Sequence, residues 1–168
     1  MKLLVTYASK YGSTAEIAEV IAKELQKRTY EVELKPIEDV DTLAGYDGFI
    51  IGSAVYAGGW MKPVARFLRS NQDLLADYPV WFFSSGPTGE GDPNEIMEGW
   101  NFPENLEKVL ETIKPKDIIL FHGKIDMDKL NFAERMIIKS VKATIGDYRD
   151  WHVIRRWAGR IDLDLQDS

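Results

Sequence analysis

The chain has 168 residues, of which 45% are hydrophobic and 29% are charged, and its formal net charge is −6 at pH 7. This composition is typical of a globular domain, and the acidic balance argues against a nucleic-acid partner. The sequence has no cysteine, which excludes disulfides, thiolate catalysis and iron–sulfur ligation. The two histidines, His122 and His152, stand far apart in the sequence, so we predict that no metal is bound.

The sequence contains neither a secretory leader nor an apolar run near the roughly 18 residues that a membrane-spanning helix needs. We therefore expect a cytoplasmic protein. Repeats, low-complexity stretches and linkers are also absent, so we expect a single domain over residues 1–168.

The first predicted elements are a strand, a polar loop and a helix. The run from Leu3 to Tyr7 is apolar and aromatic, as a strand that is buried on both faces requires. Residues 9–14 supply hydroxyl groups and one glycine. Apolar residues then recur every three or four positions up to Leu25, which predicts an amphipathic helix. Ser13 or Thr14 is its expected N-cap, with Glu16 in the first turn.

A helix that begins directly after a parallel strand presents unpaired amides and the positive end of its dipole. Gly12 would let the backbone approach an anion closely. The spacing of residues 9–14 matches neither GxxxxGK[ST] nor GxGxxG, so we interpret this loop as a cradle for one terminal phosphate. The alternative is an ordinary strand-to-helix turn whose hydroxyls cap the helix.

Strand and helix patterns alternate along the rest of the chain. Further strands are expected at residues 30–34, 48–54, 79–85 and 116–123. The first of these alternates between polar and apolar residues, as an edge strand does. Helices are expected after residue 62 with Pro63 in the first turn, over 106–113, over 131–145, and from an N-cap at Asp150 through Ile161. The alternation predicts a parallel sheet with helices on both faces.

Ligands of such sheets bind outside the carboxyl ends of the strands, which three loops leave here. Residues 9–14 suit a phosphate. Residues 53–60 carry Tyr56 and Trp60 around two glycines, and residues 84–94 are rich in glycine and small polar groups. A ligand with a phosphate at one end and a flat polar ring at the other suits all three loops, and FMN is such a ligand.

The pattern S-x-x-G-x-T of residues 9–14 resembles the phosphate loop of flavodoxins, [TS]-x-T-G-x-T, with Tyr11 in place of the second Thr. The other two loops follow in the order found in flavodoxins, so the resemblance covers the whole chain. It implies an α/β flavodoxin-like three-layer sandwich, in which helices flank a five-stranded parallel sheet of order 2-1-3-4-5. It also implies FMN as the cofactor.

The resemblance further implies which residues contact FMN. The phosphate would be held by Ser9, Lys10, Tyr11, Gly12, Ser13 and Thr14, although Lys10 also suits a solvated loop charge. The ring would lie against Ala54, Val55, Tyr56, Ala57, Gly58, Gly59 and Trp60, and Trp60 equally suits the core. The pyrimidine edge would lie against Ser85, Gly86, Pro87, Thr88 and Gly89.

Two longer segments are similar to the flavodoxin-like menaquinone-dependent protoporphyrinogen dehydrogenases. They are IIGSAVYAGGWMKPVARF at residues 50–67 and FHGKIDMDKLNFAERMIIKSVKATIGDYRDWHVIRRWAGRI at residues 121–161, which includes a G-x-[IL]-D-like motif. Those dehydrogenases tend to be rich in Arg and Tyr where this chain has Met127, Leu130 and Phe132. These differences weaken the inference of porphyrin oxidation.

We therefore expect an FMN-binding redox protein that transfers electrons between partner proteins and has no catalytic side chain. The alternative is an FMN-dependent dehydrogenase that oxidises protoporphyrinogen IX, or a similar reduced substrate, with a quinone acceptor. A third class is a non-redox module on the same fold, such as a response-regulator-like domain. The first loop lacks the acidic cluster of such a module and carries hydroxyls instead.

The predicted helix over residues 131–145 lies in a basic part of an acidic chain. Residues 124–142 contain five basic and three acidic residues, a local charge of +2. We interpret this segment as an amphipathic helix that covers the sheet and exposes a solvated basic face. The alternative, suggested by the resemblance, is peripheral docking on anionic lipid or on a quinone-reducing partner.

Overall fold

The first strand, β1 (Lys2–Ala8), lies inside the sheet and pairs in parallel with a strand on each side. The computed structural model describes residues 1–167, in which β1 lies between β2 (Glu31–Pro36) and β3 (Gly48–Tyr56). Leu3, Leu4 and Val5 of β1 are fully buried, as the apolar run predicts. β2 forms one edge of the sheet, also as predicted.

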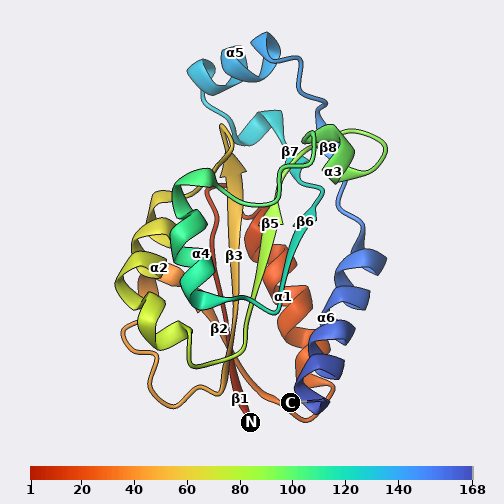
Figure 1. Ribbon diagram of the computed structural model, residues 1–168. Helices are drawn as coiled ribbons and strands as arrows, with labels where there is room; N and C mark the ends of the chain where they lie inside the picture. The colour runs from red at the N-terminus through yellow and green to blue at the C-terminus, as the bar shows by residue number, and fades with distance from the viewer. Residues whose placement is uncertain (168) are drawn as a thin grey trace.

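The sheet continues from β3 to β5 (Val80–Ser85) and β6 (Asp117–Phe121), again in parallel. The resulting order is β2-β1-β3-β5-β6 (Figure 1). This confirms the α/β flavodoxin-like fold and the predicted order 2-1-3-4-5, since β5 and β6 are the fourth and fifth expected strands. The labels differ from the predicted numbering because the structure has one more short strand, β4 (Gly59–Trp60), which forms an antiparallel hairpin with β3.

Helices cover both faces of the sheet and complete three layers (Figure 1). α1 (Ser13–Gln26) and α6 (Trp151–Gln166) pack on one face. α2 (Lys62–Leu75) and α4 (Glu107–Ile113) pack on the other, and Pro63 lies in the first turn of α2 as predicted.

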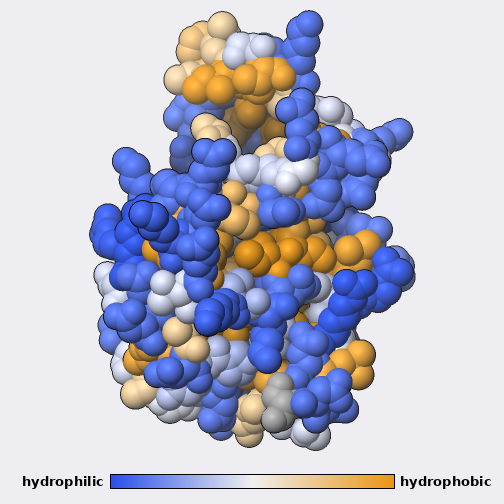
Figure 2. Space-filling model, in the orientation of Figure 1, coloured by the Kyte–Doolittle hydropathy of each residue, from blue (hydrophilic) through white to orange (hydrophobic). Residues whose placement is uncertain are grey.

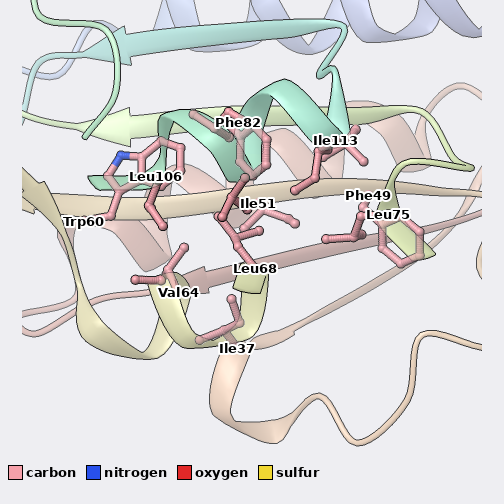
Figure 3. Close-up of a cluster of buried hydrophobic side chains, with 14 of the residues drawn as sticks. Ile37, Phe49, Ile51, Trp60, Val64, Leu68, Leu75, Phe82, Leu106 and Ile113 are labelled. Atoms are coloured by element: carbon pink, nitrogen blue, oxygen red, sulfur yellow. The ribbon is translucent and has the colours of Figure 1, made fainter. Parts of the chain in front are cut away.

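The core on the α2 and α4 side contains Trp60, whose side chain lies among Val64 and Leu106 (Figure 3). Its indole Nε1 donates a hydrogen bond of 2.8 Å to Ser84 Oγ, and its ring lies 5.3 Å from that of Phe82. The core on the opposite side joins α1 and α6, and Trp157 contributes a buried indole there.

The predicted N-cap of α1 is wrong. Gly12 occupies this position with a φ of 91°, and Ser13 already belongs to the helix. The left-handed turn at Gly12 therefore places both the Ser13 and the Thr14 side chain inside the first turn, where neither caps it. Asp150 does cap α6, since its carboxylate accepts hydrogen bonds from the amides of His152 and Val153.

α5 (Phe132–Ser140) is shorter than the helix predicted over 131–145. The chain turns out of the helix after Val141, because Lys142 takes a left-handed φ of 52°. α5 also does not cover the sheet, so that interpretation is wrong. It lies beyond the carboxyl ends of the strands (Figure 1), and none of its residues is buried.

Short elements lead to and from α5 and fill the remaining loops. β7 (Lys124–Ile125), which precedes α5 in the chain, pairs antiparallel with β8 (Gly146–Asp147), which follows it. The others are η1 (Ile37–Asp39), α3 (Pro93–Ile96), η2 (Glu104–Leu106) and η3 (Met127–Lys129). Among residues 1–167, no helix combines the length and apolar character that crossing a bilayer requires.

Candidate functional site

A cavity of about 200 Å³ opens at the carboxyl edge of the sheet, beside the point between β1 and β3 where the strand order reverses. The loop after β1, the carboxyl end of β3, and the end of β5 with the residue after it all contribute to it. The predicted residues that line it are Ser9, Lys10, Tyr11, Ser13, Thr14, Ala54, Val55, Tyr56, Ser85 and Gly86.

The loop after β1 forms a polar end of the cavity. Gly12 turns the chain, and its amide donates a hydrogen bond of 3.0 Å to Ser9 Oγ, so Ser9 stabilises the turn itself. The hydroxyls of Ser13 and Thr14 are buried, and within the described chain neither has a hydrogen-bond partner. The first amides of α1 have no intrahelical acceptor either. These groups form a cluster of unused donors beside the cavity.

Lys10 and Tyr11 of the same loop contact α5. The Lys10 ammonium forms an ion pair with Glu134 and lies 5.1 Å from the centre of the Tyr11 ring. Hydrogen bonds from the Lys10 ammonium and the Asn131 amide lower the pKa of Glu134 to about 2, while burial raises the pKa of Tyr11. Lys129 Nζ donates to the Tyr11 carbonyl at 3.2 Å. The loop is therefore tied to the segment that lies over it.

Of the predicted residues 54–60, only the three at the end of β3 line the cavity. Tyr56 lines the cavity and is 47% exposed, which leaves a ring face accessible to a ligand. Ala57 and Gly58 form a tight turn with φ values of 47° and 72°, and the Gly58 carbonyl accepts a hydrogen bond from Trp100 Nε1 at 3.0 Å. Ala57, Gly58 and Gly59 do not line the cavity, and Trp60 is part of the core, the second of the two positions that its sequence context suits.

The end of β5 and the loop after it contribute Ser85 and Gly86 to the cavity, whereas Pro87, Thr88 and Gly89 lie outside its lining. The Pro87 carbonyl accepts a hydrogen bond of 2.9 Å from the amide of Gly123. This bond joins the loop to the end of β6, so Gly86 and Gly123 meet at the cavity wall.

The segment after β6 forms a wall of the cavity that we did not predict. Its lining residues, together with Glu16 from α1, are Gly123, Lys124, Ile125, Asp126, Lys129, Leu130 and Ile138. Local periodicity gives no signal for these residues, because β7 and η3 are only two and three residues long. The G-x-[IL]-D-like motif at residues 123–126 was the available signal.

The buried side chain of Arg149 holds the first turn of α1 in place. Its guanidinium, which is 2% exposed, forms ion pairs of 2.7 Å with Glu16 and with Asp147, and it donates to the Ser13 carbonyl at 3.2 Å. The Arg149 hydrogen bonds lower the pKa of Asp147. Arg149 thus ties Glu16, in the turn that carries the free hydroxyls, to Asp147 of β8.

The donor set fits a phosphate monoester better than a metal. Hydroxyls and amides suit phosphate oxygens, and within residues 1–167 no cluster of three or more His, Cys, Asp or Glu side chains could hold a metal ion. Val55, Ile125, Leu130 and Ile138 add apolar surface for a ring. FMN combines these two chemistries, so the residues present fit this cofactor.

This fold and this cavity define a flavodoxin-like α/β protein with buried, unpartnered hydroxyls at the first strand-to-helix turn. A family model described as "Flavodoxin domain" matches residues 4–151, and the chain therefore belongs to the flavodoxin domain family. A likeness to flavodoxins is also found among solved structures. A flavodoxin of Streptococcus pneumonia TIGR4 superimposes with a TM-score of 0.62 at 15% identity, covering 98% of this chain and 99% of that one.

Flavodoxin 2 from Bacillus cereus gives a TM-score of 0.56 at 24% identity, covering 84% of this chain and 99% of that chain. Among curated proteins, the chain is similar to the protoporphyrinogen IX dehydrogenase [quinone] of Escherichia coli (strain K12). The two are 20% identical over 172 residues, which span 96% of this chain and 94% of that protein.

Proposed function

We propose that this chain binds FMN and transfers electrons between partner proteins. The observation that carries the proposal is the pair of buried hydroxyls, Ser13 Oγ and Thr14 Oγ1, that lack partners at the start of α1. An unsatisfied buried hydroxyl costs about 1–3 kcal/mol, and a phosphate that accepts from both would remove that cost. The helix dipole adds further stabilisation of a negative charge at this position.

Each loop has a distinct role in this proposal. The hydroxyls of Ser13 and Thr14 and the first amides of α1 hold the phosphate, and Gly12 allows the close approach. Tyr56 covers one side of the flavin ring, while Gly86 presents backbone groups to its polar edge. FMN supplies the electron transfer when it is bound. We assign no catalytic side chain, and the acidic chain suits basic redox partners in the cytoplasm.

A second candidate function is oxidation of protoporphyrinogen IX, or of a similar reduced substrate, with a quinone acceptor. Two observations favour it: the whole-chain similarity to the E. coli dehydrogenase, and the apolar wall formed by Ile125, Leu130 and Ile138 with Lys124 and Lys129 nearby. Such a wall suits an apolar ring that carries carboxylates. A protein that only passes electrons to other proteins binds no such substrate and would not require this apolar wall.

FMN binding is tested by titrating the purified chain with FMN or with riboflavin and following the change in flavin absorption and fluorescence. We expect FMN to bind, and riboflavin to bind at least about tenfold more weakly because it lacks the phosphate that the hydroxyls hold. Equal affinities for the two flavins, or no binding of either, would contradict the site.

The two functions are then separated with the FMN-loaded protein. Protoporphyrinogen IX and a menaquinone analogue are added without oxygen, and porphyrin fluorescence is followed against a protein-free control. Porphyrin formation that requires both the protein and the quinone supports the dehydrogenase. No turnover, combined with rapid electron exchange with a flavodoxin reductase, supports the electron carrier.

A further inference from the structure

The outward side of α5 and the turn after it form an exposed apolar surface. Among residues 1–167, eleven large hydrophobic residues are exposed, and five of them fall between residues 132 and 145. They are Phe132, Met136, Ile137, Val141 and Ile145, with Phe132 80% exposed and Ile137 60% exposed. Figure 2 shows hydrophobic side chains gathered on α5 at the top of the molecule. We call this group of five residues the α5 surface.

The inner side of α5 is anchored, so the α5 surface faces away from the domain. Glu134 is paired with Lys10 of the phosphate loop, and Ile138 lines the cavity. Arg135 Nε donates to the carbonyls of Met127 and Leu130, each at 3.0 Å. Since Glu134 and Ile138 occupy the opposite side of the helix from Phe132 and Met136, α5 cannot turn its apolar side inward without breaking these contacts.

Cations flank the α5 surface in a chain whose net charge is negative. Arg135, Lys139 and Lys142 are all exposed, and residues 135–146 contain no acidic residue. The nearest carboxylates on either side, Glu134 and Asp147, are already paired with Lys10 and Arg149. This part of the chain therefore carries three uncompensated positive charges against a total of −6.

We propose that the α5 surface docks on an anionic lipid bilayer. Its apolar side chains would enter the boundary of the acyl chains, while Arg135, Lys139 and Lys142 contact lipid phosphates, as in interfacial amphipathic helices. The helix projects beyond the body of the domain (Figure 1), so it can reach a flat surface. A second copy of this chain is disfavoured as the occupant, because pairing two α5 surfaces would bring their six cations together.

The test is co-sedimentation of the full chain with vesicles of phosphatidylglycerol and phosphatidylcholine, compared with phosphatidylcholine alone, at low and high salt. We expect binding to the anionic vesicles that weakens with salt. Ile137→Ser is expected to weaken it about tenfold, and Lys139→Gln about fivefold. The matched controls are Leu163→Ser, which is 59% exposed on α6, and Lys108→Gln on α4, and both should bind as the unmodified chain does.

Three results would overturn the proposal: no binding to anionic vesicles at low salt, equal loss in Ile137→Ser and Leu163→Ser, or a stable dimer that Ile137→Ser dissociates. Circular dichroism of every variant shows that each is folded before it is compared. The experiment contains no flavin and no redox assay. Its outcome is therefore independent of whether FMN binds at the cavity.

Discussion

Thr6 and Thr14 each bury a hydroxyl without a partner, but in different surroundings. Thr14 Oγ1 lies at the cavity, whereas Thr6 belongs to β1 and does not line it. Both side chains are almost fully buried, at 0% and 1% exposure for Thr6 and Thr14. An unsatisfied buried hydroxyl destabilises the ligand-free protein in both cases, but only the Thr14 hydroxyl is placed to donate a hydrogen bond to a ligand.

This difference predicts that two isosteric variants gain the same stability but differ in FMN affinity. Thr14→Val should raise the free energy of unfolding of the flavin-free chain by about 1 kcal/mol, because it removes an unsatisfied hydroxyl. The same change should weaken FMN binding about tenfold, since one donor to the phosphate is lost. Thr6→Val should give the stability gain alone. Denaturant unfolding and FMN titration measure both quantities, and an FMN affinity unchanged by Thr14→Val would contradict its role.

At Gly123 the constraint is steric, because there is no room for a side chain. A Cβ at this position would lie 2.5 Å from the carbonyl oxygen of Gly86, which is a backbone atom and cannot rotate away. Gly123→Ala should therefore destabilise the chain by about 2 kcal/mol and weaken FMN binding, because the two residues meet at the cavity wall.

The matched control is Gly159→Ala in α6. Its added Cβ would meet only the end of the Arg28 side chain, at 3.4 Å. A glycine-to-alanine change inside a helix stabilises by about 0.5–1 kcal/mol. Thermal unfolding of the two variants should consequently shift in opposite directions, and equal shifts would show that the Gly86–Gly123 contact has no special cost.

Trp60 shows what the sequence leaves undecided about a single residue. An aromatic side chain after a parallel strand suits both a flavin face and a core. The choice is made by the turn at Ala57 and Gly58, which brings the chain back as β4 and directs Trp60 toward Ser84 and α4. That turn depends on two positive φ angles, one of them at an alanine, and no local pattern indicates them.

At the scale of elements, the ion pair between Lys10 and Glu134 joins the phosphate loop to α5. Because the pKa of Glu134 is lowered from 4.5 to about 2 in the folded chain, the pair stabilises the fold above about pH 4.5. That stabilisation is lost as the pH falls from about 4.5 through 2. Both side chains contact water, so the effect on global stability is small and local order is the better readout.

We predict that the Glu134 carboxyl, followed by NMR, titrates near pH 2 in the unmodified chain. Lys10→Met should move this pKa upward toward 4.5, because it removes the largest cause of the shift. Amide exchange of α5 at neutral pH should accelerate in the same variant. Lys23→Met, which removes an exposed lysine of α1, is the control and should leave the Glu134 titration in place.

The longer elements could be predicted because each combines a period with a boundary signal. β1, β3 and β5 are apolar runs, and α6 has Asp150 as its cap. α5 was predicted too long because Val141 and Ile145 continue its apolar spacing after the backbone has turned at Lys142. Its exposure could not be predicted, since amphipathicity shows that a helix has an apolar side and not what that side meets.

At the scale of the molecule, FMN is expected to act as a stabiliser. A ligand that binds the native chain alone raises the free energy of unfolding by about 2.7 kcal/mol at a free concentration one hundred times its Kd. For a domain of this size we therefore predict that FMN raises Tm by about 5–10 °C. Riboflavin at the same concentration should raise Tm less. A Tm that does not respond to FMN would contradict binding to the folded chain.

The strand order was predicted through the resemblance of the loops to those of flavodoxins, whereas the alternation of strands and helices by itself predicts only a parallel sheet with helices on both faces. The alternation also indicated which loops leave the carboxyl ends of the strands, where ligands of such sheets bind. It could not identify the wall formed by residues 123–138. That wall depends on β7 pairing with β8 across α5, a contact of two residues with no periodic signal.

The pairing of α1 with α6 also has a consequence for how the chain emerges from the ribosome. Val5 and Ile17 share a buried cluster with Trp157 and Ile161, which are synthesised much later. At about 5–20 residues added per second, these N-terminal side chains wait on the order of ten seconds for their cover. Until α6 is synthesised, the apolar side of α1 therefore lacks the residues that cover it in the folded domain.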